Sequence, residues 1–128
     1  MKKLFIAALL CGTLQTQAAS QYQPVGFYNS LSQLLIDCSP YAPQRAQEIC
    51  RWYIAGVVDT FTIVVAQRFK PNFIRCYQSA YPNVSLLQTQ MLVFNYLKSH
   101  PKILADNPAS TVGGIYLVEF PIPKDCEK

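Results

Sequence analysis

The chain has 128 residues, with 11 Lys and Arg, seven Asp and Glu and one His. Hydrophobic residues make up 51% of it and charged residues 14%, a composition that excludes a disordered chain. About 110 residues remain once an N-terminal export signal is set aside, which allows one core and excludes a second domain or an α/β barrel. Lys2 and Lys3 leave with that signal, so nine cations face seven anions and nucleic acid is not an expected partner.

The first 18 residues have the layout of a secretion signal. Residues 1–3 form a basic start, residues 4–11 form a short apolar run, and the small residues Thr16 and Ala18 suit cleavage after Ala18, with Ala19 as the alternative. The apolar run is shorter than the roughly 20 residues that cross a bilayer. The sequence therefore predicts a periplasmic protein, cleaved near Ala18 and free of the membrane afterwards.

Four cysteines remain after the signal: Cys38, Cys50, Cys76 and Cys126. An even number of cysteines in a small exported domain predicts two disulfides, and three pairings are open. We favour Cys38–Cys50, which closes a tight loop between two predicted helices, and Cys76–Cys126, which ties the C-terminal tail to a mid-chain loop. A metal site is disfavoured, because the chain has no Cys-x-x-Cys pair and its histidine is far from every cysteine in sequence.

Apolar residues recur at helical spacing along the chain and predict an all-α fold, a small bundle of four to five helices stapled by two disulfides. The first helical segment covers residues 27–38 and stops at the prolines of residues 39–43. The second covers residues 44–68. Its β-branched stretch, residues 57–65, would also suit a buried strand, but the pattern continues far beyond the usual strand of about five or six residues.

The second helix has a predicted inner face of seven residues at steps of three and four: Ala46, Ile49, Cys50, Tyr53, Val57, Phe61 and Val64. Asp59 lies within the apolar part, so the helix is not expected to cross a membrane. We expect its carboxylate to be at least half-buried and satisfied inside the protein. Gly56, nearly one turn earlier, is expected to let a neighbouring helix approach closely.

Residues 69–84 are predicted to form a long irregular connection, because Pro71 and Pro82 argue against regular structure. A loop of this length in a compact domain is usually functional or pinned, and Cys76 is the expected pin. Its basic, polar and aromatic side chains make it the preferred surface for a partner. The candidate contact residues are Lys70, Asn72, Arg75, Tyr77 and Tyr81. The alternative is that this loop only covers the core and the turn at residues 98–102 makes the contact.

Two further helices are predicted in the C-terminal third. Residues 85–88 read Ser-x-x-Gln, a capping box, and start a helix that ends near Ser99, before Pro101. A last helix covers about residues 108–120, with Asp106 or Asn107 as its cap and Pro108 in its first turn. Its adjacent glycines, residues 113–114, are interpreted as a close helix contact that costs roughly 1 kcal/mol per glycine. The predicted inner faces are Leu87, Met91, Phe94 and Leu97 in one helix and Val112, Ile115, Tyr116 and Phe120 in the other.

The sequence carries no recognisable catalytic constellation. A nucleophile needs a base within hydrogen-bond reach, and the one histidine, His100, is placed at a predicted helix end beside a proline. Motifs of hydrolases, zinc proteases and phosphate-binding loops are missing, and the acidic residues are not spaced to form a pair on one helix face. We therefore expect neither an enzyme nor a cofactor.

Several motifs follow one another in a characteristic order. They are Leu34–Cys38 at the end of the first helix, Cys-x-x-Tyr-Ile-x-Gly-Val-x-Asp at residues 50–59, Cys76, Val84–Ser85, Tyr96–Pro101, and Phe120–Pro121 before Cys126. In this order, behind a signal peptide, the chain resembles the Rap/Tai family of periplasmic immunity proteins, which neutralise peptidoglycan amidases delivered by type VI secretion. The family motif residues are Cys50, Tyr53, Gly56 and Asp59.

The resemblance implies a single helical immunity domain over residues 19–128, two disulfides and frequent homodimers. It also implies a partner, a cognate peptidoglycan amidase effector whose active-site groove the protein occludes. Two other classes fit the same size, helices and cysteines: a periplasmic stress chaperone similar to the HdeA-like proteins, and a structural envelope protein. An amidase gene beside this one would favour immunity.

Overall fold

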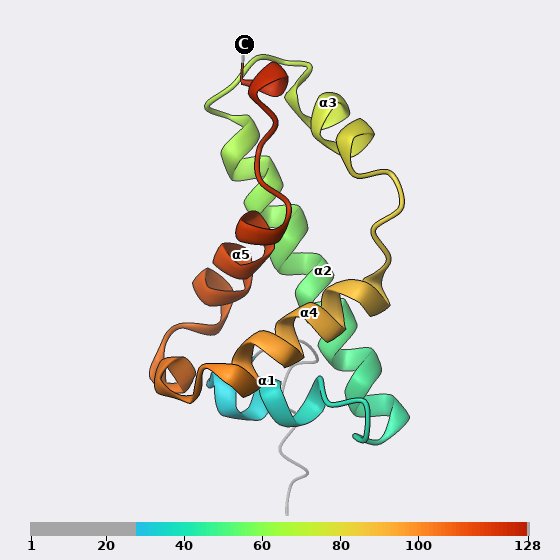
Figure 1. Ribbon diagram of the computed structural model, residues 1–128, viewed down its shortest axis with the longest axis vertical. Coiled ribbons are helices and arrows are strands. Elements are labelled where there is room, and N and C mark those ends of the chain that lie inside the picture. The colour runs from blue at the N-terminus through green and yellow to red at the C-terminus, as the bar shows by residue number, and fades with distance from the viewer. Residues whose placement is uncertain (1–27, 128) are drawn as a thin grey trace, which may run out of the picture.

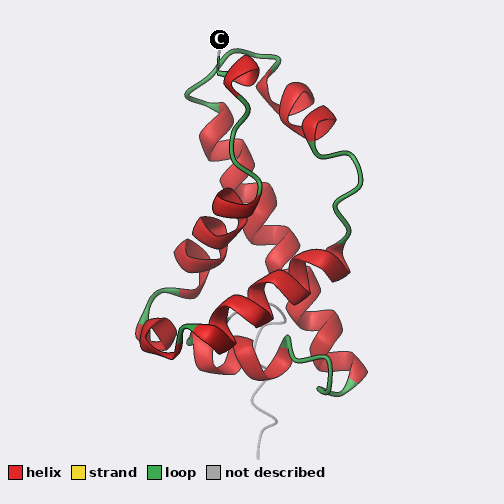
Figure 2. Cartoon of the chain, in the orientation of Figure 1, coloured by secondary structure: helices red, strands yellow, loops and turns green. Residues whose placement is uncertain are grey.

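The computed structural model describes residues 28–127, and the predicted signal and its cleavage site lie outside this range. The described residues form five α-helices and two short 3₁₀ turns, without a strand (Figures 1 and 2). The elements are α1 (Leu31–Asp37), α2 (Gln44–Ala66), α3 (Phe73–Ala80), α4 (Leu86–Ser99), η1 (Pro101–Ala105), α5 (Pro108–Glu119) and η2 (Lys124–Cys126). The disulfides are Cys38–Cys50 and Cys76–Cys126, so both the all-α fold and the favoured pairing are confirmed.

The long helix α2 is the spine of the molecule, and α1, α3, α4 and α5 all pack against it (Figure 1). It covers 23 residues, which excludes the strand interpretation of its β-branched stretch. Two of the helices that pack against it, α1 and α5, have clear start signals. Ser30 caps α1, and Asn107 caps α5 with Pro108 in its first turn, as predicted for the last helix.

The buried side chains form two clusters at opposite ends of α2. The large cluster lies where α1, α4, the first half of α2 and α5 meet, and contains Tyr28, Leu31, Leu34, Cys38, Cys50, Ile54, Val93, Leu97, Val112 and Ile115. The small cluster lies between the end of α2, α3 and the C-terminal tail, and contains Phe73, Tyr77 and Cys126. Each cluster therefore includes at least one cysteine of a disulfide, and the two disulfides staple different ends of the molecule.

A polar network is buried inside the large cluster, around the side chain of Gln90. The Gln90 amide nitrogen donates to the backbone oxygen of Cys38 at 2.9 Å, and its oxygen accepts from the Arg51 guanidinium at 3.2 Å. Because an unpaired buried amide is costly, these bonds explain how α4 can turn a glutamine into the core. They join α4 to α2 and to the end of α1, beside the Cys38–Cys50 disulfide.

The helix α4 begins with the predicted capping box. Ser85 Oγ accepts from the Gln88 backbone nitrogen at 3.1 Å, and the Gln88 side chain accepts from the Ser85 backbone nitrogen at 2.8 Å. The predicted inner face of α4 was partly wrong: Leu97 is buried, but Leu87 is 55% exposed. The face is rotated because the helix buries Gln90 for the network described above. The buried residues are Thr89, Gln90, Val93 and Leu97.

The predicted irregular connection at residues 69–84 was wrong, because α3 forms in its middle. Pro71 and Pro82 lie on either side of the helix and do not interrupt it. Aromatic rings recur every four residues and stack on one side of α3, with centroids 4.9 Å apart for Phe69–Phe73 and 5.7 Å for Phe73–Tyr77. This spacing was the helical signal that the prolines concealed.

Four expectations for individual residues of α2 and α5 are decided by the structure. Of the two adjacent glycines, Gly113 confirms the predicted close helix contact, because a Cβ atom there would lie 2.7 Å from the Phe61 ring, whereas a Cβ atom at Gly114 would meet nothing within 4 Å. The close approach of a neighbouring helix that we expected at Gly56 was wrong, because a Cβ atom there would meet nothing within 4 Å. Asp59 is exposed, since it points away from the side of α2 that buries Cys50 and Ile54, so its predicted burial was wrong. Val64, expected inside, is 51% exposed.

Candidate functional site

The end of the molecule that carries the small cluster, here called the tip, comprises residues 67–81 and 120–127. The Cys76–Cys126 disulfide joins α3 to the C-terminal tail covalently. Two tyrosines of this region add polar links: the Tyr77 hydroxyl donates to the Phe120 backbone oxygen at 2.7 Å, and the Tyr81 hydroxyl donates to the Pro121 backbone oxygen at 2.5 Å. The tail is therefore held along its length rather than at its end alone.

The five predicted contact residues all lie at the tip, but the structure divides them into two sets. Lys70, Asn72 and Arg75 are exposed and available to a partner. Tyr77 is only 5% exposed, and its hydroxyl is already bonded, so it is a core residue rather than the surface contact we expected. Tyr81 is half-buried and bonded to the tail in the same way. The helical turn of α3, unseen in the sequence, produces this division.

Two neighbouring tyrosines, Tyr77 in the tip and Tyr116 beside it, are held in their neutral form. Burial raises the pKa of Tyr77 well above its usual range, and the neighbouring phenols of Tyr116 and Tyr81 raise it further. Burial likewise raises the pKa of Tyr116, with Asp59 as the second cause. A neutral phenol can donate a hydrogen bond, so the link from Tyr77 to Phe120 persists at every physiological pH.

The alternative contact region, residues 98–102, lies at the other end of the molecule, where η1 packs against α1 and α4. Lys98 and Lys102 are exposed there. His100 ends α4, as predicted, with its ring stacked on Tyr96 at a centroid distance of 4.1 Å and its Nδ1 atom 2.8 Å from the Tyr96 backbone oxygen. The two candidate contact regions are far enough apart in the fold to be tested separately.

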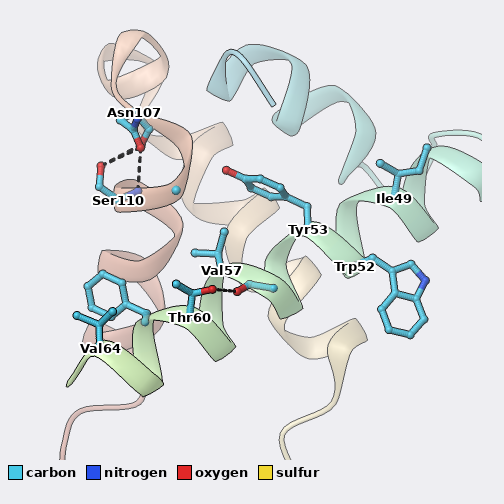
Figure 3. Close-up of a pocket in the computed structure, with 11 residues that line it drawn as sticks. Ile49, Trp52, Tyr53, Val57, Thr60, Val64, Asn107 and Ser110 are labelled. Atoms are coloured by element: carbon cyan, nitrogen blue, oxygen red, sulfur yellow. Dashed lines mark hydrogen bonds between the residues drawn. The ribbon is translucent and has the colours of Figure 1, made fainter. Parts of the chain in front are cut away.

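A second concave surface, here called the α2 groove, was not foreseen from the sequence. It has a volume of about 780 Å³ and runs between the outer side of α2 and the start of α5 (Figure 3). Trp52 points outward from one end of it, while Tyr53 and Val57 point towards α5. The lining residues are Ile49, Trp52, Tyr53, Gly56, Val57, Thr60, Phe61, Val64, Asn107, Ala109 and Ser110.

Thr60, Asn107 and Ser110, three of the polar residues that line the α2 groove, are hydrogen-bonded within the chain (Figure 3). The Thr60 hydroxyl donates to the Gly56 backbone oxygen at 2.8 Å. The Asn107 side chain accepts from the Ser110 backbone nitrogen at 3.1 Å, and the Ser110 hydroxyl donates back to the Asn107 backbone oxygen at 3.2 Å. A pocket for a small polar ligand needs a few convergent free groups, so this groove is better suited to an apolar surface.

The exposed side of α2 carries large apolar side chains among its polar ones. At the groove Trp52 is 69% exposed, and outside the groove Ile63 is 54% exposed. By length and composition alone α2 could cross a membrane, a test that core helices of soluble proteins also pass, and only 11% of its most apolar window is buried. The combination of a long apolar helix and little burial identifies α2 as an element with an uncovered face.

Neither surface contains metal-binding chemistry. Between residues 28 and 127, no group of three or more His, Cys, Asp or Glu side chains could hold a metal ion. The four cysteines in this range are consumed by the disulfides.

The family relationship can now be set beside this geometry. No curated protein and no solved structure matches the chain. The sequence model of the Rap1a immunity protein family matches residues 30–121, a range that includes α1 to α5 and the Phe120–Pro121 segment. That match covers well over half of the sequence and confirms the resemblance seen in the motifs. The chain therefore belongs to the Rap1a immunity protein family.

Proposed function

We propose that this protein is a periplasmic immunity protein whose target is a peptidoglycan amidase delivered by type VI secretion. Family membership, carried by the match over residues 30–121, supports the coarser function, protection against a type VI effector. The amidase is the finer part of the proposal and comes from the motif resemblance. In this proposal the chain is exported, cleaved near Ala18, and active without a cofactor or catalytic group of its own.

The proposed mechanism is occlusion of the effector's active-site groove by the tip. A segment that is already ordered loses less conformational entropy on binding, and the tip is ordered by the Cys76–Cys126 disulfide and two tyrosine bonds. Its outer side presents the exposed side chains of Lys70, Asn72 and Arg75. Arginine is enriched among the residues that dominate interfaces, so Arg75 is the proposed anchor.

The working form in this proposal is a homodimer, which the family resemblance implies. The tip and the α2 groove lie on different parts of the fold: the tip groups α3 with the tail, and the groove lies between α2 and the start of α5. One surface can therefore bind an effector while the other is covered. This separation allows each role to be tested by its own variants.

The decisive experiment is rescue in the periplasm. Cells that express the cognate amidase effector should survive when the exported chain is co-expressed, and the purified partners should bind in calorimetry. Arg75→Ala should weaken binding without lowering the melting temperature, whereas Arg45→Ala, an exposed arginine near the far end of α2, should not. Loss of binding in Lys102→Ala instead would move the contact to residues 98–102.

A failed rescue also has a defined meaning. If the chain protects against no amidase of this class, including its genomic neighbour, the amidase proposal is wrong. If it then suppresses aggregation of unrelated proteins at low pH, the chaperone class replaces immunity as the function.

A further inference from the structure

A further concave surface lies beside the tip and is here called the Glu119 cleft. It has a volume of about 490 Å³ and is formed by the connection between α3 and α4, the first half of α4 and the end of α5. Among the described residues that line it, Glu119 alone carries a charge. Ligand pockets commonly enclose roughly 300–1,000 Å³, so the cleft is large enough for a small ligand group, and its walls indicate which one.

The polar side chains of the Glu119 cleft differ from those of the α2 groove in their availability. Glu119 and Asn83 are exposed, so their oxygens can accept hydrogen bonds from a ligand. Gln88 is engaged instead in the capping box, where its side-chain oxygen accepts from the Ser85 backbone nitrogen at 2.8 Å. The acceptors that a ligand meets are therefore a carboxylate and an amide oxygen.

Three features of the Glu119 cleft favour a positively charged ligand. The first is the Glu119 carboxylate itself. The second is the end of α5, because Glu119 is the last residue of that helix and a helix carries a partial negative charge at its C-terminus. The third is the pair of rings from Tyr81 and Phe120, which line the cleft and have electron-rich faces that attract cations.

The shape of the walls favours an arginine side chain over a simple ion. Pro82, Val84 and Leu92 supply apolar surface that can contact an aliphatic stem, as long cationic side chains require. A guanidinium is planar and has five donors, so it can pair with the Glu119 carboxylate, donate to Asn83 and lie against an aromatic ring at the same time. An ammonium group or a metal ion uses fewer of these features.

The aromatic wall of the cleft is held in place by the tip. The Tyr81 hydroxyl donates to the Pro121 backbone oxygen, and the rings of Tyr81 and Phe120 meet edge to face with centroids 5.3 Å apart. The carboxylate, in contrast, is placed at a cost to its own helix, because an anion at a helix C-terminus is electrostatically unfavourable. A bound cation would relieve that cost.

We propose that the Glu119 cleft is a guanidinium-binding site and that its ligand is an arginine side chain of the effector. This deepens the proposed function and rests on it for the identity of the partner. The cleft shares Tyr81 and Phe120 with the tip, so an effector that contacts the tip also reaches the cleft. An enzyme that cuts peptidoglycan peptides must bind chains with free carboxylates, and arginine is the side chain that best matches a carboxylate. Glu119 then takes the place of such a group.

The first test needs no effector. Nα-acetyl-arginine amide should shift the backbone resonances of Asn83, Glu119 and Phe120 saturably in NMR titrations of the oxidised mature protein. Nα-acetyl-citrulline amide has the same length but a neutral urea group, and should bind at least about tenfold more weakly, since it forms no charged pair. Glu119→Gln should abolish the preference for arginine. Glu48→Gln is the matched control, because Glu48 is an exposed acid on α2, outside the cleft.

The second test uses the cognate amidase in calorimetry. Glu119→Gln should weaken its binding by about tenfold, because a charge-assisted hydrogen bond is lost, and the deficit should shrink at high salt. The melting temperature of the free chain should stay level or rise slightly, since a carboxylate leaves the negative end of α5. Glu119→Asp keeps the charge and should retain part of the affinity, whereas Glu48→Gln should bind like the unmodified chain.

The two tests separate this inference from the function on which it rests. Equal binding of the arginine and citrulline compounds, or a preference that persists in Glu119→Gln, would overturn the guanidinium site. Effector binding that tolerates Glu119→Gln would overturn the assignment of the ligand to the effector and leave a site for a free cation. Selective binding of the arginine compound by a chain that binds no amidase would instead reject the proposed function while the site itself stands.

Discussion

The two ends of α2 hold their neighbours by different means. At the large-cluster end, apolar side chains from α1, α2, α4 and α5 are buried together, and a polar network around Gln90 completes the packing. At the tip, three residues are buried, and order comes from stacked aromatic rings, two tyrosine hydrogen bonds and the Cys76–Cys126 disulfide. The large-cluster end is stabilised mainly by burial of apolar side chains, and the tip mainly by its disulfide and hydrogen bonds. The two ends should therefore respond differently to the loss of a disulfide.

The largest expected effect comes from removing the disulfide of the tip. Cys76 and Cys126 are 50 residues apart in sequence, and closing a loop of that size is worth about 4 kcal/mol in the chain-entropy model. In Cys76→Ser/Cys126→Ser, amide exchange should accelerate throughout α3 and the tail while α1 and α4 stay protected. Hydrogen exchange with mass spectrometry measures this.

The matched change at the other end is Cys38→Ser/Cys50→Ser. Those cysteines are 12 residues apart, so the entropic loss is smaller, about 3 kcal/mol. Because Cys38 and Cys50 are buried in the large cluster, removing their disulfide should lower the global melting temperature rather than release one segment. Uniform loss of protection in both double variants would show that the molecule has one cooperative unit and that the comparison of its ends is wrong.

The next effect concerns the two adjacent glycines of α5. Gly113→Leu should reduce the free energy of unfolding by about 1–3 kcal/mol, because any side chain there collides with the Phe61 ring of α2. Gly114 is the control, since a Cβ atom there meets nothing within 4 Å. Gly114→Ala should increase stability by up to about 1 kcal/mol through helix propensity. Urea unfolding of both variants checks the opposite signs, and equal signs would contradict the contact.

How far the sequence predicted the molecule also differs between the two ends. At the large cluster, local signals placed the helices, although not the inner face of α4: the helical period of residues 44–68, the Ser85–Gln88 capping box and Pro108 each agreed with the structure. At the tip, the two prolines outweighed the aromatic spacing, so α3 was missed. The rings at residues 69, 73, 77 and 81 belong to a cluster that the C-terminal tail completes, and the Tyr77 hydroxyl bonds to a residue 43 positions further along the chain. Contacts between residues so far apart cannot be predicted from local sequence patterns.

The same reasoning explains the errors within α2. Periodicity identifies a helix but fixes its inner face only to within a turn, and this helix is apolar nearly all round. The placements of Gly56 and Asp59 required knowing which side α4 and α5 cover. The α2 groove was missed for that reason, although an apolar helix with glycine at its centre was the signal that could have pointed to it.

A smaller effect is expected from the hydroxyl of Tyr77. Tyr77→Phe keeps the ring in the small cluster but removes the bond to the Phe120 backbone oxygen, which should cost about 1 kcal/mol. The readout is exchange of the tail amides. Tyr41→Phe is the control, because Tyr41 is among the most exposed aromatic residues and lies outside the small cluster. No change in the tail would mean that the disulfide alone holds it.

Alkaline pH should weaken the protein through its buried phenols. Burial raises the pKa of Tyr28, Tyr53, Tyr77 and Tyr116 above the value of about 10 that tyrosine has in an unfolded chain. Above pH 10 the unfolded chain therefore loses protons that the folded protein keeps. Stability should be level below about pH 10 and fall as the pH rises from there towards the folded pKa values. Urea midpoints between neutral pH and pH 11 test this, and Tyr77→Phe should flatten the fall by removing one titrating group.

The smallest expected effect is that of Asp59→Ala. Its carboxylate is exposed, and exposed substitutions away from special features usually change stability by less than about 0.5 kcal/mol. In the isolated monomer the melting temperature should therefore barely move, whereas a satisfied buried acid would have been costly to remove. Effector binding should be unchanged as well, because Asp59 lies outside the tip, the surface proposed for the contact. Thermal melting and calorimetry on the same preparation measure both quantities, and a large fall in melting temperature would show that the Asp59 carboxylate is satisfied inside the protein after all.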